Sequence, residues 1–93
     1  MPEDANIGMG FLEQALELVP KYAAAHAYLA WALEIRFVRG GFVESDATEG
    51  VRHARAALTY GGDDATALAV ASLTLLHLGH DFAAASVSGY ILL

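Results

Sequence analysis

The amino-acid sequence predicts an all-α protein of about five helices that pair as antiparallel hairpins. Three observations lead to this prediction. Alanine and leucine dominate a chain that is 56% hydrophobic and 17% charged, and both residues favour helix over strand. Apolar residues recur at helical spacing between glycine and proline breakers. An Ala-Leu pair followed by a breaker occurs at Ala15 and again at Ala57, an offset of 42 residues.

The first two helices are expected over residues 4–19 and 23–37. Pro20 ends the first helix because proline cannot continue the hydrogen-bond ladder. Gly40 and Gly41 end the second. The predicted inner positions of the first helix are Phe11, Leu12, Ala15, Leu16 and Val19, and those of the second are His26, Leu29, Ala30, Leu33 and Phe37.

The remaining three helices are expected over residues 46–60, 63–78 and 81–93. Residues 42–45 are expected to form a loop, and Asp46 and Glu49 have the spacing of a capping box that opens the third helix. Asp63 or Asp64 is expected to cap the fourth helix. Gly79 is the expected end of that helix, and Asp81 the cap of the fifth.

Two stretches resemble the second-helix signature of the tetratricopeptide (TPR) repeat, and two resemble its first-helix signature. The second-helix matches are Gly8, Leu12, Ala15, Leu16 and Pro20, and then Gly50, Ala54, Ala57 and Leu58 with Gly62 in place of the proline. The first-helix matches are Leu29-Ala30 with Leu33, and Ala71-Ser72 with Leu75. The tryptophan expected early in each first helix is replaced by His26 and by Leu68.

The TPR resemblance implies an α/α superhelix that forms one domain over residues 1–93. Residues 4–19 would be the second helix of one unit, 23–60 a full unit and 63–93 a further unit. TPR units are about 34 residues long, so the offset of 42 implies an insertion near residues 38–46. Helices would approach closely at the small residues Gly8, Ala30, Gly50 and Ser72.

A narrower resemblance concerns residues 11–23, 39–42 and 61–69. These look like bacterial proteins in which TPR repeats lie C-terminal to an adenylate/guanylate-cyclase-like domain. None of the cyclase motifs occurs in this chain. The resemblance implies a regulatory or scaffolding role in signal transduction rather than an enzymatic activity.

Composition and charge argue against several classes of function. The net charge is −6 and the five basic residues form no run, so nucleic-acid binding is not expected. The longest uncharged stretch, residues 65–80, is too short to span a membrane. The chain has no cysteine, which excludes disulfides and thiolate metal sites. We expect a cytoplasmic protein without a cofactor.

The expected role is binding of a protein or peptide on the concave face of the superhelix. First helices line this face in stacked hairpins. The residues expected there are Tyr28, Trp31, Glu34, Ile35, Leu73, Leu76 and His77. Trp31 and Tyr28 lie one turn apart and would anchor a partner, unless Trp31 belongs to the core. The groove offers no basic clamp for a terminal carboxylate.

A second expected role is self-association through the C-terminal helix, most simply as a two-fold dimer. No charged residue follows residue 81, and an uncovered apolar repeat end normally pairs with another surface. The residues expected to take part are Phe82, Tyr90, Ile91, Leu92 and Leu93. A purely structural dimerisation module is therefore an alternative to a binding module.

A small helical enzyme or metal-binding domain is the remaining alternative, and we do not expect it. His77, His80 and Asp81 have the spacing of metal ligands, but Gly79 interrupts them and no firm third ligand is evident. No nucleophile elbow or phosphate loop occurs. His53 is expected to face solvent, and His26 to be partly buried.

Overall fold

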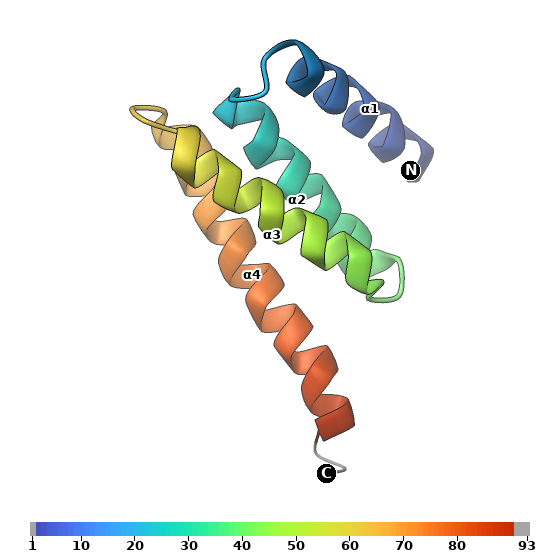
Figure 1. Cartoon of the computed structure of the whole chain (residues 1–93). Coiled ribbons are helices and arrows are strands. Elements are labelled where there is room, and N and C mark those ends of the chain that lie inside the picture. Colours follow the sequence, from blue (N-terminus) through green and yellow to red (C-terminus); the bar gives the residue numbers. More distant parts are fainter. Residues whose placement is uncertain (1, 91–93) are drawn as a thin grey trace.

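The computed structural model describes the backbone of residues 2–90 and the side chains of residues 7–79. Over these residues the chain forms four helices and no strand: α1 (Pro2–Leu18), α2 (Ala23–Arg39), α3 (Glu44–Tyr60) and α4 (Ala65–Tyr90). Each helix runs antiparallel to the one before it (Figure 1). The all-α prediction is therefore confirmed, with four helices rather than about five.

Helix α2 is the central element, because it packs against α1, α3 and α4. Most of the core between α2, α3 and α4 consists of alanines, namely Ala23, Ala27, Ala30, Ala54, Ala57, Ala67 and Ala71. Side chains this small allow the three helix backbones to lie close together. Larger side chains pack in two further clusters. Met9 of α1 packs with Leu29 and Leu33 of α2, and Phe37 of α2 packs with Ala47 and Leu78.

Local chemistry explains where most of the helices begin and end. Helix α1 stops just before Pro20, as predicted. The amide of Gly40 donates to the carbonyl oxygen of Arg36 at 2.7 Å, and Gly41 then turns the chain with a φ of 90°, a conformation that glycine adopts without steric cost. Asp64 caps α4, because its Oδ1 accepts a hydrogen bond from the amide of Ala67 at 2.9 Å.

The expected break at Gly79 is wrong, since α4 continues without interruption to Tyr90. A glycine inside a helix costs only about 1 kcal/mol, and Gly79 keeps a negative φ. Asp81 therefore lies within α4 and does not cap a fifth helix. The C-terminal part of α4 projects past the ends of α2 and α3 (Figure 1).

The predicted start of α3 is also wrong. The helix begins at Glu44 with no side-chain cap, so only residues 40–43 connect it to α2. The other five residues of the expected insertion near residues 38–46 belong to α2 or α3. Asp46 lies in the first turn and does not cap it. Its Oδ1 instead accepts hydrogen bonds from Nε and Nη2 of Arg36, at 3.0 and 2.7 Å. The carboxylate thus ties α3 to α2.

Two of the four expected close approaches occur. Ala30 is fully buried, and a Cβ added to Gly50 would lie 3.7 Å from the carbonyl oxygen of Ala30. Gly8 and Ser72 are exposed, so their predicted burial is wrong. The inner positions expected for α2 are all buried, whereas Phe11 and Val19 of α1 are exposed.

Candidate binding site

The outer surface of α2 carries large apolar side chains that the core does not cover. Trp31 is 50% exposed and Tyr28 is 39% exposed, and their ring centroids lie 6.5 Å apart. Ile35 and Val38 continue the same stripe toward the end of the helix, both also exposed. The alternative in which Trp31 is a core residue is therefore wrong for this structure.

Helix α4 adds a second row beside the α2 stripe. Nδ1 of His77 lies 3.5 Å from Oε2 of Glu34, which joins the two helices at this surface. Trp31 precedes Glu34 by one turn, and Leu73 precedes His77 by one turn. Because α2 and α4 run in the same direction (Figure 1), Trp31 and Leu73 lie on the same side of the Glu34–His77 contact.

We call this surface the α2–α4 face, made of Tyr28, Trp31, Glu34, Ile35, Leu73, Leu76 and His77. Leu73 and Leu76 are exposed to 55% and 67%, so the face is apolar at both helices. Its polar atoms are concentrated at Glu34 and His77. A surface of this chemistry suits an apolar or aromatic segment of another molecule.

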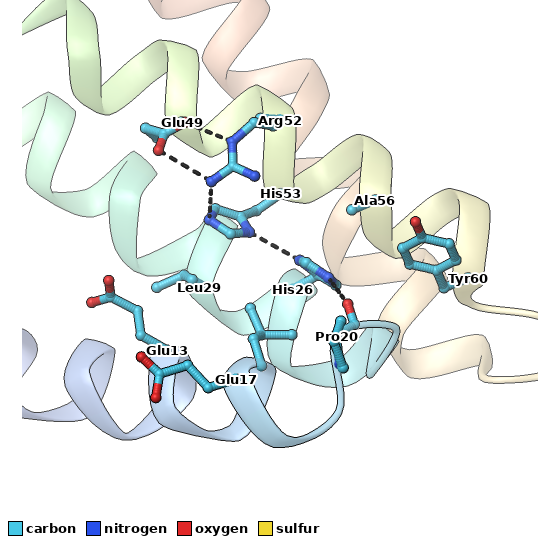
Figure 2. A pocket seen from close by; sticks show the side chains of 11 residues that line it. Glu13, Glu17, Pro20, His26, Leu29, Glu49, Arg52, His53, Ala56 and Tyr60 are labelled. Atoms are coloured by element: carbon cyan, nitrogen blue, oxygen red, sulfur yellow. Dashed lines mark hydrogen bonds and ion pairs between the residues drawn. The ribbon is translucent and has the colours of Figure 1, made fainter.

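A polar groove of about 530 Å³ lies on another side of α2, between α1 and α3. Figure 2 shows Glu13 and Glu17 of α1 on one wall, opposite His26 of α2 and Arg52 of α3. Tyr60 closes the groove near Pro20, with its ring 5.9 Å from that of His26. Nζ of Lys21 lies 5.8 Å from the centre of the Tyr60 ring.

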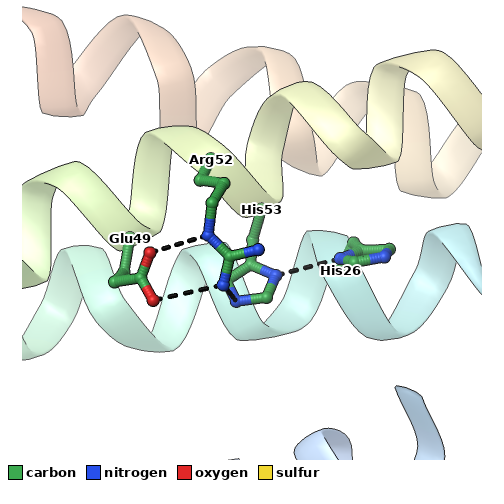
Figure 3. A network of polar contacts seen from close by, with 4 residues as sticks. All are labelled: His26, Glu49, Arg52 and His53. Atoms are coloured by element: carbon green, nitrogen blue, oxygen red, sulfur yellow. Dashed lines mark hydrogen bonds and ion pairs between the residues drawn. The ribbon is translucent and has the colours of Figure 1, made fainter. Parts of the chain in front are cut away.

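Two buried histidines form an ordered hydrogen-bond chain at the floor of this groove (Figure 3). Nδ1 of His26 lies 2.9 Å from Nδ1 of His53, Nε2 of His26 lies 2.8 Å from the carbonyl oxygen of Pro20, and Nη2 of Arg52 lies 3.2 Å from Nε2 of His53. The guanidinium can only donate and the carbonyl can only accept. One assignment of protons satisfies every contact: both rings neutral, with Nδ1 of His53 donating to Nδ1 of His26.

Burial and charge both keep His53 neutral. Burial, and to a smaller extent the neighbouring Arg52 and His26, lowers the pKa of His53 from 6.5 to about 4. Glu49 accepts from Nε and Nη2 of Arg52, at 2.7 and 3.1 Å. This hydrogen bond lowers the pKa of the Glu49 carboxyl and raises that of the Arg52 guanidinium.

The prediction that His53 faces solvent is wrong, and His26 is buried rather than partly buried. The sequence does contain a signal for their contact. When residues 23–39 and 44–60 form an antiparallel hairpin around residues 40–43, His26 lies 13 residues before the turn and His53 lies 9 residues after it. The pairing therefore places the two histidines about one helical turn apart along the hairpin. Helical periodicity, applied one helix at a time, does not use this pairing.

Several expected site residues lie outside the described side chains. Phe82 and Tyr90 belong to the backbone of α4, but their side chains are not described, and Ile91, Leu92 and Leu93 are not described at all. The side chains of His80 and Asp81 are not described either, although their backbone belongs to α4. Among the described residues, no three His, Asp or Glu side chains lie close enough together to hold a metal ion.

Comparison with known proteins does not identify a family for this chain. No protein-family model, curated protein or solved structure matches the chain. None of the helices in the described part of the chain has the length and hydropathy that a membrane crossing requires.

Proposed function

We propose that this chain is a non-catalytic, TPR-like protein-interaction module that binds an apolar or aromatic segment of a partner protein on its α2–α4 face. The observation that carries the proposal is the exposure of Trp31 beside Tyr28 on a helix whose other sides are packed. Tryptophan and tyrosine are the residues most enriched at the energetic centres of protein interfaces.

The order of helix packing supports the TPR-like part of the proposal. Each helix packs against the next one along the chain, and α2 also packs against α4. Consecutive hairpins therefore lie side by side, which is the arrangement of helical repeat proteins. The cyclase-like resemblance extends the proposal to a cytoplasmic regulatory or scaffolding module of a signalling protein.

The rigidity of the face also favours binding. Helix α2 is held by α1, α3 and α4, and Glu34 of α2 contacts His77 of α4 at the site. Aromatic side chains on a fixed helix lose little conformational entropy when a partner binds. A small interface on this face would therefore lose little of its binding free energy to the ordering of side chains.

The test uses random peptides displayed on phage and selected on the wild-type chain. We expect the selected peptides to contain aromatic or aliphatic anchors and to bind Trp31→Ala at least about tenfold more weakly, which corresponds to about 1.4 kcal/mol. Leu58→Ala, at an exposed leucine of α3, is the matched control and is expected to bind as the wild type does.

The single tryptophan gives a second measurement on the same complexes. Because Trp31 is the only tryptophan, a peptide that covers it is expected to shift its fluorescence to shorter wavelength. Peptides that bind Trp31→Ala and the wild type equally, with unchanged fluorescence, would contradict the proposal.

A further inference from the structure

The repeat of 42 residues makes α1 the counterpart of α3 and α2 the counterpart of α4. Gly50 lies where α3 meets both α2 and α4. A Cβ added there would be 2.6 Å from Cδ1 of Leu78 in α4, 3.5 Å from Cβ of Leu33 in α2 and 3.7 Å from the carbonyl oxygen of Ala30 in α2. The counterpart of Gly50 in α1 is Gly8. It is exposed, and a Cβ added there would meet nothing within 4 Å.

The rest of the α3 surface that faces inward shows the same contrast. From Gly50 to the C-cap its buried positions are Gly50, His53, Ala54, Ala57 and Gly61. Asp46 and Ala47 are buried too, but the side chains of their counterparts, residues 4 and 5, are not described. The counterparts of the first five, in α1 and just after its end, are all apolar, and we call them the α1 outer face: Gly8, Phe11, Leu12, Ala15 and Val19. None of these five is fully buried, and Phe11 is 67% exposed.

The complementary surface is present on α4. The α2 residues that meet α3 are His26, Ala30, Leu33 and Phe37. Their counterparts, which we call the α4 flank, are Leu68, Ser72, Leu75 and Gly79. Ser72 and Gly79 are exposed, and the two leucines are only partly buried. An apolar pocket of about 250 Å³, lined by Gly79 together with Leu78 and Val51, opens beside this flank.

We propose that the α1 outer face of one copy of this chain packs on the α4 flank of a second copy, which repeats between chains the contact that α3 makes with α2 inside one chain. In this arrangement Gly8 meets Ser72 and Leu75. Phe11 meets Leu68 at the position where His53 meets His26, so an apolar pair replaces a polar one.

A second copy of the chain suits the α4 flank because the chain already makes the same kind of contact internally. The α1 helix of a second copy has a glycine, Gly8, and apolar residues at the same spacing as the residues that α3 packs against α2. Neither the α1 outer face nor the α4 flank contains a charged residue. Two different surfaces meet, so the contact is head-to-tail and leaves one surface of each kind free. Assembly should therefore continue beyond a dimer as concentration rises.

The test mixes two variants that each lack one of the two surfaces. Phe11→Glu places a charge in the α1 outer face, and Ser72→Arg blocks the α4 flank. By light scattering, we expect wild type to increase in mass with concentration and each variant alone to be monomeric. An equal mixture should give a dimer of twice the chain mass, because each variant keeps the surface that the other lacks.

A matched control and two contrary outcomes complete the experiment. Ile7→Glu introduces the same charge at an exposed apolar residue of α1 whose counterpart in α3 is itself a glutamate, Glu49; it should associate as wild type does. If the chain instead dimerises through residues 82–93, both variants would still be dimers. If the wild type remains monomeric at every concentration, the proposed contact does not form. Either result overturns the proposal, and neither bears on peptide binding at Trp31.

Discussion

Helices α1 and α3 have the same sequence pattern but lie in different environments. Gly50 of α3 lies against α2 and its counterpart Gly8 faces solvent; likewise His53 is buried and its counterpart Phe11 is exposed. The pattern of small and apolar residues thus specifies a surface that can pack. Whether that surface is covered depends on which helices are available to cover it.

Substitution of the two glycines, Gly50 and Gly8, is expected to give the largest difference in stability between α3 and α1. In Gly50→Leu the added Cβ would lie 2.6 Å from Cδ1 of Leu78, so we expect the free energy of unfolding to fall by about 3 kcal/mol. Gly8→Leu has open space and should raise it, by up to about 1 kcal/mol, because glycine is a poor helix former. Urea denaturation at a concentration where the chain is monomeric measures both. Equal losses in the two variants would contradict the difference in packing.

The second effect concerns acid, because α3 buries a titratable residue where α1 has Phe11. The pKa of His53 is lowered from 6.5 to about 4 in the folded chain, so between these pH values the unfolded chain binds a proton that the folded chain excludes. Stability should therefore fall as pH drops from 6.5 to 4, by up to about 3 kcal/mol at 1.36 kcal/mol per pKa unit.

The matched variant carries the counterparts from the other repeat unit, His26→Leu together with His53→Phe. It lacks His53 and cannot take up this proton, so its stability should change less over the same pH range. Denaturation of both proteins at pH 7, 5.5 and 4.5 gives the difference. Identical pH profiles would mean that the histidine chain does not remain neutral in the folded state.

A third, smaller effect tests the polar anchor that holds α3 on α2. Asp46→Ala removes two charge-assisted hydrogen bonds from Arg36 and should lower the free energy of unfolding by about 1–2 kcal/mol. The control is Glu49→Ala, whose pair with Arg52 is exposed on both sides; it should cost less than about 0.5 kcal/mol. The account of α3 anchoring fails if the order of the two losses is reversed.

The smallest effect compares the starts of α4 and α2, which are also counterparts. Asp64 caps α4 through its side chain, whereas Tyr22 at the start of α2 makes no side-chain cap. Asp64→Ala should destabilise by about 1 kcal/mol, and Tyr22→Asp should stabilise by a similar or smaller amount. Thermal unfolding followed by circular dichroism would detect both shifts, and a destabilising Tyr22→Asp would show that the tyrosine has a packing role.

Helical periodicity predicted the all-α class and the buried positions of α2, because a helix packed on several sides buries whatever its pattern makes apolar. It failed for α1, where Phe11 and Val19 follow the same pattern but are not covered by a helix of the described residues. It also failed at Gly79, because a single glycine costs too little to stop a helix that is otherwise well formed.

The binding role of the candidate site stays a prediction. Tyr28, Trp31 and Leu73 are exposed, and Glu34 contacts His77. The histidine chain was missed because it depends on pairing between two helices rather than on the pattern within one. Asp46 was misassigned as a cap, since a capping box and an acidic residue in a first turn look alike in sequence.

The central claim is that the α1 outer face is an unpaired copy of the surface that α3 packs against α2. Inside the chain, Cβ atoms at positions 50 and 33 would lie 3.5 Å apart, within the range that a disulfide bridges. The chain contains no cysteine, so Gly8→Cys and Leu75→Cys, at the counterpart positions, can be introduced into separate copies. On mild oxidation we predict a covalent dimer in the mixture of the two variants and monomers in each variant alone. A mixture that does not cross-link, or dimers that form equally well in either single variant, would contradict the claim.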